Sequence, residues 1–180
     1  LKDLDTTTIA FVNAKLAKVY GVDPAKYPSL VSAPDAFTEV QLDPTQRKGI
    51  LMHAGWLAYE GSPGEPSPIH RGAYVARHVI CTPLGSPPPG AAGAMPDKAP
   101  GATNRARITN VTAGCGDGCH GGKGGVMNPI GFSFEHFDSI GQQRATDDGQ
   151  PIDTTGSIDL LGNFGNAVQL FDIAVQNART

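Results

Sequence analysis

The sequence predicts a mainly α, loop-rich fold with a small hairpin near 142–162. Apolar residues recur every three or four positions in several separate segments, which is typical of amphipathic helices. The chain also holds 23 glycines and 15 prolines among 180 residues, an excess that predicts many turns and extended connections between the helices. Because 39% of its residues are apolar and only 17% are charged, the chain is not of the disordered class.

Helical periodicity recurs three times in the first half of the chain. The spacing of apolar residues predicts amphipathic helices over 7–20, 46–59 and 69–82. Gly21 ends the first of them, since glycine commonly follows the last turn of a helix. Four prolines interrupt 22–45, and we therefore expect an irregular connection there.

Composition divides the chain into three regions, which we expect to form one compact unit. A helical region at 1–85 is followed by a Pro/Gly/Ala-rich strap or linker at 86–113. The segment at 114–180 carries a glycine-rich cysteine–histidine element and ends in a helix near 167–174. The chain opens at Leu1 rather than at Met, and we expect it to be part of a larger protein or complex.

The charge balance excludes two broad classes of function. The chain holds 14 Lys and Arg against 17 Asp and Glu, for a net charge of −3. A nucleic-acid-binding domain would show a basic excess, and a protein held on an anionic membrane would show a polybasic face. No stretch approaches the ~18 consecutive apolar residues of a membrane span. We therefore expect neither a nucleic-acid partner nor a membrane span.

The sharpest chemical signal is the sequence Cys115-Gly-Asp-Gly-Cys119-His120. Two cysteines directly before a histidine are the attachment signature of c-type haem. The two thiols reach the two vinyl groups on one edge of the porphyrin, and the adjacent imidazole binds the iron. The usual spacer between the cysteines has two residues, whereas this one has three. On a helix the longer spacing still places both thiols on one face.

Other interpretations of this element stay open at the level of sequence. Cys115 and Cys119 are also placed to form a disulfide that closes a small loop. A zinc site with His120 would need four ligands, and no second Cys/His pair stands at a usual spacing. A nucleophilic thiol would need a base and an electropositive setting. The glycines around Lys123 do not form a phosphate loop, because no Ser or Thr follows that lysine.

Further blocks stand in a fixed order on both sides of this element. They are Phe11–Gly21, Arg47-Lys-Gly-Ile-Leu51, Ser67-Pro-Ile-His-Arg-Gly72, Pro87-Pro-Pro89, Met127-Asn-Pro-Ile-Gly-Phe132, Glu135-His-Phe-Asp138, Gly141 with Arg144, and Asp147–Asp153. As a series, covering about 1–160, they resemble the planctomycete-type cytochrome c family. Its members are large exported multi-domain proteins of unknown function that carry a c-type haem motif.

This resemblance implies one covalently attached haem c. The haem would be bound through Cys115 and Cys119, with His120 as an axial iron ligand and cytochrome-c-like helices around it. The resemblance also implies export, to the periplasm or to the cell surface. The longer spacer departs from the family pattern, and so does Asn128, which stands where the family has Asp.

The second iron ligand has several candidates. Met127 would complete a Met/His pair, a ligation that raises the potential in electron-transfer haems. The alternatives are the remaining histidines, His53, His70, His78 and His136. If none of them binds, the iron has an open position at which small molecules react.

Together these features predict a c-type cytochrome domain that transfers single electrons in an exported or cell-surface assembly. Its partners would be a redox protein or other subunits of a larger complex. We expect an electron-transfer protein rather than an enzyme. Two alternatives remain: a peroxidase- or oxygenase-like haem enzyme with an open iron site, and a haem-free structural module with a Cys115–Cys119 disulfide.

Overall fold

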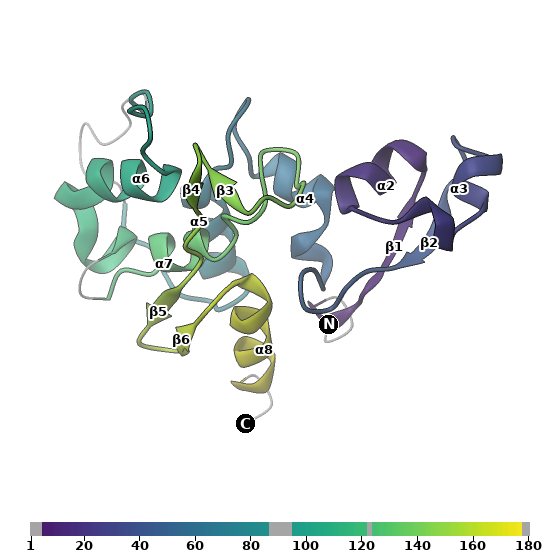
Figure 1. Cartoon of the computed structure of the whole chain (residues 1–180). Helices are drawn as coiled ribbons and strands as arrows, with labels where there is room; N and C mark the ends of the chain where they lie inside the picture. The colour runs from purple at the N-terminus through teal and green to yellow at the C-terminus, as the bar shows by residue number, and fades with distance from the viewer. Residues whose placement is uncertain (1–4, 87–94, 122–123, 178–180) are drawn as a thin grey trace.

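The computed structural model describes residues 5–86, 95–121 and 124–177, whose course is drawn in Figure 1. Leu1 and the proline run at 87–89 lie outside these residues. The α-helices are α2 (Ala14–Tyr20), α3 (Ser29–Ser32), α4 (Ala54–Tyr59), α5 (Pro68–His78), α6 (Asn104–Thr112), α7 (Met127–Phe132) and α8 (Ala167–Asn177). The strands are β1 (Ile9–Val12), β2 (Thr38–Gln41), β3 (Thr146–Asp147), β4 (Gln150–Pro151), β5 (Gly156–Ile158) and β6 (Gly162–Phe164). Short turns complete the order: η1 (Pro24–Lys26), η2 (Ile50–Met52), η3 (Ala113–Cys115) and η4 (Gly116–His120).

The expectation of a mainly α fold with cytochrome-c-like helices around one haem is wrong. The helices are short, and they pack with three antiparallel sheets of two strands each. Figure 1 shows α6, which leads into the cysteine–histidine element, at one edge of the molecule and α3 at the opposite edge. The described helices and hairpins therefore do not form a cytochrome-c-like helical arrangement. Among the described residues, none of the helices has the length and apolar character needed to cross a membrane.

The N-terminal part forms a small lobe with a core of its own. Strand β1 pairs with β2 in antiparallel register from Ile9↔Gln41 to Val12↔Thr38, so residues 9–12 are a strand and not the start of the expected helix. The helix begins only at Ala14, because the side chain of Asn13 accepts a hydrogen bond from the backbone N–H of Leu16 at 2.9 Å. Six buried side chains fill the lobe: Ala10, Val12, Ala17, Leu30, Val40 and Leu42.

The helix expected over 46–59 is divided into two pieces. The turn η2 and the helix α4 are preceded by Gly49, which has a φ of 71° and packs against the backbone of Asp5. A side chain at that position would be strained and would meet that backbone, so the chain cannot continue as a regular helix through residue 49. The helix expected over 69–82 is present as α5 and ends at His78.

Helices α5 and α7 form the tightest crossing of the main core. A Cβ atom on Gly72 would overlap the carbonyl oxygen of Met127, and a Cβ on Gly131 would overlap that of Pro68. Glycine at both points lets the two backbones touch, which fixes the position of α7 on α5. Around this crossing lies the main apolar core, which includes Leu57, Val75, Ile130, Phe134, Phe137, Ile158, Phe164, Leu170 and Phe171.

A fully buried arginine on α5 holds the loop that follows α7. Arg71 is 0% exposed. Its Nη1 donates to the carbonyl oxygen of Phe137 at 2.9 Å, and its Nη2 donates to those of Leu57 at 2.8 Å and Asp138 at 2.7 Å. Burial lowers the pKa of Arg71 to about 10, which leaves the guanidinium charged at neutral pH. The side chain thus supplies a donor to the carbonyl groups of Leu57 and Phe137 in the core.

A second buried arginine, Arg47, holds the end of the same loop. Its Nη2 donates to the carbonyl oxygen of Gly141 at 2.6 Å, and its Nη1 donates to that of Met52. The guanidinium lies over the rings of Tyr20, at 4.6 Å, and Phe137, at 4.5 Å. Arg47 therefore joins the N-terminal lobe to the main core.

The second half of the chain contains more regular structure than its composition indicates. Helix α6 lies within the residues assigned to the strap, and Thr103 starts it by accepting a hydrogen bond from the N–H of Ala106 at 3.1 Å. Near 142–162 the chain forms two hairpins, β3–β4 and β5–β6, in place of one. The C-terminal helix is present as α8.

Candidate functional site

The cysteine–histidine element directly continues α6. The turn η3 ends at Cys115, and η4 is a π-helical turn that ends at His120. Because a π turn closes over five residues, Cys119 and His120 stand one turn after Cys115. Both cysteines are half-buried free thiols. Such turns occur often at functional sites.

A chain of three hydrogen bonds leads from α6 to the ring of His120. The hydroxyl of Thr112 donates to the carbonyl oxygen of Ile108 at 2.7 Å. The Nδ2 of Asn128 donates to Oγ1 of Thr112 at 2.8 Å. The Nδ1 of His120 lies 3.1 Å from Oδ1 of Asn128.

The direction of every bond in this chain follows from its first member. A carbonyl oxygen only accepts, so the single hydroxyl proton of Thr112 points to Ile108. The Thr112 oxygen must then accept from its other neighbour, which identifies the group of Asn128 that faces it as the NH₂. The amide oxygen of Asn128 therefore faces His120, and Nδ1 of that ring must be the donor.

This arrangement selects one tautomer of His120. In a neutral imidazole with the proton on Nδ1, the Nε2 atom carries the free electron pair. A histidine that binds a metal commonly donates its other ring N–H to an acceptor that fixes the ring. Thr112 and Asn128 are each 5% exposed, so water does not compete for these hydrogen bonds. The buried side chains therefore leave Nε2 of His120 as the nitrogen with the free electron pair.

The backbone around the site holds Asn128 in place. Asn128 is the second residue of α7, whose crossing with α5 is fixed by Gly72 and Gly131. The N–H of Val126 donates to the carbonyl oxygen of Cys119 at 3.0 Å and closes the loop between the two. The backbone that carries His120 and the one that carries Asn128 are thus tied together directly.

The candidates for a second iron ligand lie in different surroundings. Met127 is buried at the start of α7, while His70 and His78 are exposed on α5. His53 stands edge-on to Tyr20 with ring centroids 5.9 Å apart, in a different part of the molecule. Ligation by any of these residues, or by the half-buried His136, stays a prediction.

Burial is the main cause of the lowered pKa values of two of these histidines. The positive charge of Arg47 further lowers the pKa of His53, and that of Arg144 further lowers the pKa of His136.

Among the residues that the structure describes, no group of three or more His, Cys, Asp or Glu side chains could hold a metal ion.

The donor set of the element nevertheless fits a covalently attached haem. Two free thiols precede a histidine whose Nε2 is left for a metal, as the chemistry of c-type attachment requires.

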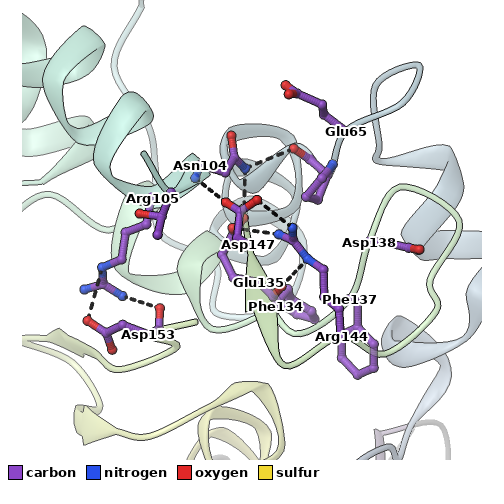
Figure 2. Close-up of polar contacts among 12 residues, drawn as sticks. Glu65, Asn104, Arg105, Phe134, Glu135, Phe137, Asp138, Arg144, Asp147 and Asp153 are labelled. Atoms are coloured by element: carbon purple, nitrogen blue, oxygen red, sulfur yellow. Dashed lines mark hydrogen bonds and ion pairs between the residues drawn. The ribbon is translucent and has the colours of Figure 1, made fainter. Parts of the chain in front are cut away.

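A separate polar cluster around Glu135, Arg144 and Asp147 is shown in Figure 2. Arg144 donates to Glu135 at 3.1 Å and pairs with Asp147 at 3.1 Å. Lys98 pairs with Asp147 at 2.6 Å, and Asn104 donates to Glu135 at 3.1 Å and to Asp147. These contacts tie the segment before α6 to the loop after α7. The charge of Arg144 is therefore already engaged by protein carboxylates.

The pKa values of the two carboxylates in this cluster shift in opposite directions. Burial raises the pKa of Glu135, against the opposing influence of Arg144 and Asn104. Burial alone would also raise the pKa of Asp147, but the hydrogen bonds from Lys98 and Asn104 and the charge of Arg144 together lower it. Asp147 is thus the ionised centre of the cluster.

The functional residues that sequence reasoning missed are Thr112 and Asn128. Asn128 stood out only as a departure from a family pattern, and Thr112 carried no signal. Their role depends on a contact between α6 and α7, which residue spacing along the chain does not reveal.

Comparison with known proteins gives one match. A family model described as "PSCyt3: Protein of unknown function (DUF1588)" matches residues 47–147, more than half of the 180 residues. The matched range holds both buried arginines, the cysteine–histidine element, Thr112 and Asn128. No curated protein and no solved structure matches the chain.

Proposed function

The chain belongs to the PSCyt3 family, a planctomycete cytochrome-c-associated domain of unknown function, and from this premise we propose that it carries one covalent haem c. Cys115 and Cys119 supply the two thioether sulfurs, and His120 supplies an axial nitrogen. The function we propose is single-electron transfer within a larger exported assembly. Because c-type haem is attached outside the cytoplasm, the proposed location is the periplasm or the cell surface.

The observation that carries this proposal is the hydrogen bond between His120 and Asn128. It leaves Nε2 of His120 as the nitrogen with the free electron pair, and it holds the ring from a buried partner. A histidine that served only as a surface residue would not need a two-residue support reaching back to α6. Two unpaired thiols immediately before such a histidine match the requirements of thioether attachment.

The chain's own residues would carry out the remaining tasks. A bound haem supplies an iron that accepts and returns one electron. His120 binds and orients it, Asn128 and Thr112 fix the ring of His120, and the α5–α7 crossing keeps these supports rigid. Cys115, Cys119 and His120 are half-buried rather than fully buried, which favours exchange of electrons with a partner protein over enclosure of a substrate.

The test is to express the exported chain in a bacterium with working haem-attachment machinery and to apply the pyridine haemochrome assay. We expect a c-type haemochrome and a mass increase of one haem that survives denaturation. Cys115→Ala with Cys119→Ala should abolish covalent attachment. The matched control is Cys81→Ala, because Cys81 is exposed and lies outside the element. A colourless wild-type protein from this host would overturn the proposal.

The absorption spectrum then decides between electron transfer and the enzyme alternative. Sharp reduced bands that do not change with cyanide indicate two protein ligands and support electron transfer. A high-spin spectrum that shifts on addition of cyanide or peroxide would indicate an open iron position and would count against it. If the reduced bands are sharp, replacing the candidate residues one at a time identifies the second iron ligand. The candidates are Met127, His53, His70, His78 and His136.

A further inference from the structure

We propose that Asn128 sets the electronic character of His120 as an iron ligand. Its neutral amide oxygen accepts a hydrogen bond from the Nδ1–H group, whereas a carboxylate at this position would accept a stronger one. The inference rests on the proposed function, since it concerns a potential that only the haem-loaded protein has. It assigns Asn128 as a positioning and tuning residue and Thr112 as the residue that orients it.

The first step of the argument is the orientation of the amide. The hydroxyl of Thr112 donates its only proton to the carbonyl oxygen of Ile108. Its oxygen therefore accepts from the NH₂ group of Asn128, which orients the amide oxygen toward His120. A flipped amide would leave the Thr112 oxygen, whose only proton is donated to Ile108, facing another acceptor. The orientation is therefore determined by the protein and not by the ring.

The second step is the charge of the acceptor. Hydrogen bonds to an ionised acceptor are roughly twice as strong as those between neutral groups. A carboxylate at this position would draw the Nδ1 proton further and would raise the basicity of Nε2. A more basic nitrogen stabilises ferric iron more than ferrous iron and so lowers the potential. The neutral amide has the opposite consequence and keeps the potential higher.

The third step is the rigidity and burial of the acceptor. Asn128 is 5% exposed and sits on α7, which Gly72 and Gly131 lock against α5. The amide cannot retreat from the ring without moving that helix. Because water is excluded from this hydrogen bond, the electrostatic difference between a neutral and a charged acceptor at His120 is screened little.

The experiment compares the midpoint potentials of haem-loaded wild type, Asn128→Asp and Asn128→Leu. We expect N128D to favour ferric over ferrous iron by at least about tenfold relative to wild type, which is about 59 mV downward for one electron. N128L removes the acceptor and should move the potential upward. The matched control is Asn110→Asp, which places the same charge on the exposed side of α6 and should leave the potential nearly unchanged.

A second readout separates tuning from mere structural support. The hyperfine-shifted proton resonances of the His120 ring, measured by NMR on the ferric protein, should move in opposite directions in N128D and N128L relative to wild type. A residue that only held the fold would change haem yield or melting temperature without moving these resonances in opposite directions. If N128D does not load haem, the direction of the shift in N128L alone decides.

The outcomes distinguish this inference from the proposed function. Wild type without covalent haem overturns the proposed function, and the inference falls with it. Haem-loaded wild type and N128D with potentials that differ no more than wild type and N110D overturn the inference alone. Haem-loaded N128L with the wild-type potential also overturns it. A downward shift in N128D together with an upward shift in N128L supports it.

Discussion

Gly72 on α5 and Gly131 on α7 lie where the backbones of the two helices are in direct contact. Each position lies against a carbonyl oxygen of the facing segment, that of Met127 for Gly72 and that of Pro68 for Gly131. This double contact is the mechanical basis of the site, because α7 carries the residue that holds His120. Both glycines belong to the blocks on which the resemblance to a family rests.

Gly131→Ala should destabilise the protein by about 3 kcal/mol or more, since overpacking against a backbone that cannot move exceeds the usual range. Chemical denaturation measures the change in the free energy of unfolding. The control is Gly55→Ala on α4, where a Cβ meets nothing within 4 Å. There we expect a gain of about 0.4–1 kcal/mol. Equal effects of the two substitutions would contradict the role given to the crossing.

Arg71→Met should cost about 3–5 kcal/mol, because it takes the guanidinium donor away from buried carbonyl oxygens. Those of Leu57 and Phe137 lose the guanidinium donor, and that of Asp138 keeps only the N–H of Gly141 at 3.3 Å. Arg77→Met on the same helix is the control, because Arg77 is exposed and its loss should fall within about 0.5 kcal/mol. Thermal denaturation of the two variants checks the difference. A tolerated Arg71→Met would mean that the loop after α7 is held by other contacts.

Stability should fall in acid partly through Asp147. Its pKa is lower in the folded protein than in the unfolded chain, so the unfolded chain takes up the proton first as the pH falls. The stabilisation is present above the unfolded value of about 3.9 and is lost as the pH drops through the folded value. We expect Asp147→Asn to reduce the slope of stability against pH below about 4, as measured by urea denaturation at a series of pH values.

The exposed Asp159 provides the matched control for this pH prediction. Asp159→Asn removes the same charge from the chain without touching the cluster of Lys98, Asn104 and Arg144. Its slope of stability against pH should follow the wild type. If D147N and D159N gave the same profile, the cluster in Figure 2 would contribute nothing specific to acid stability.

The N-terminal lobe should respond to its helix cap. Asn13→Ala removes the acceptor for the N–H of Leu16 and should cost about 1 kcal/mol, while Asn13→Asp keeps an acceptor and should cost little. Hydrogen exchange of the amides in α2 reports this change locally. Faster exchange confined to α2 and its neighbours is the expected result, and unchanged exchange in N13A would show that the cap is dispensable.

The helical parts of the fold were predictable where local signals suffice. The stop at Gly21, the helix α5 and the C-terminal helix α8 follow from residues close to each element in sequence. The strand β1 was not predictable in this way, because its apolar spacing also suits a helix. Its state depends on β2, which lies more than twenty residues further along the chain.

The same division holds for the candidate site. The candidate thiols and imidazole could be recognised from residue order alone, since Cys115, Cys119 and His120 are neighbours along the chain. Which ring nitrogen of His120 is free could not be predicted from residue order, because it depends on a hydrogen-bond chain through Asn128 and Thr112. Those residues meet where two helices pack, and packing is settled by contacts between distant parts of the chain rather than by local residue preferences.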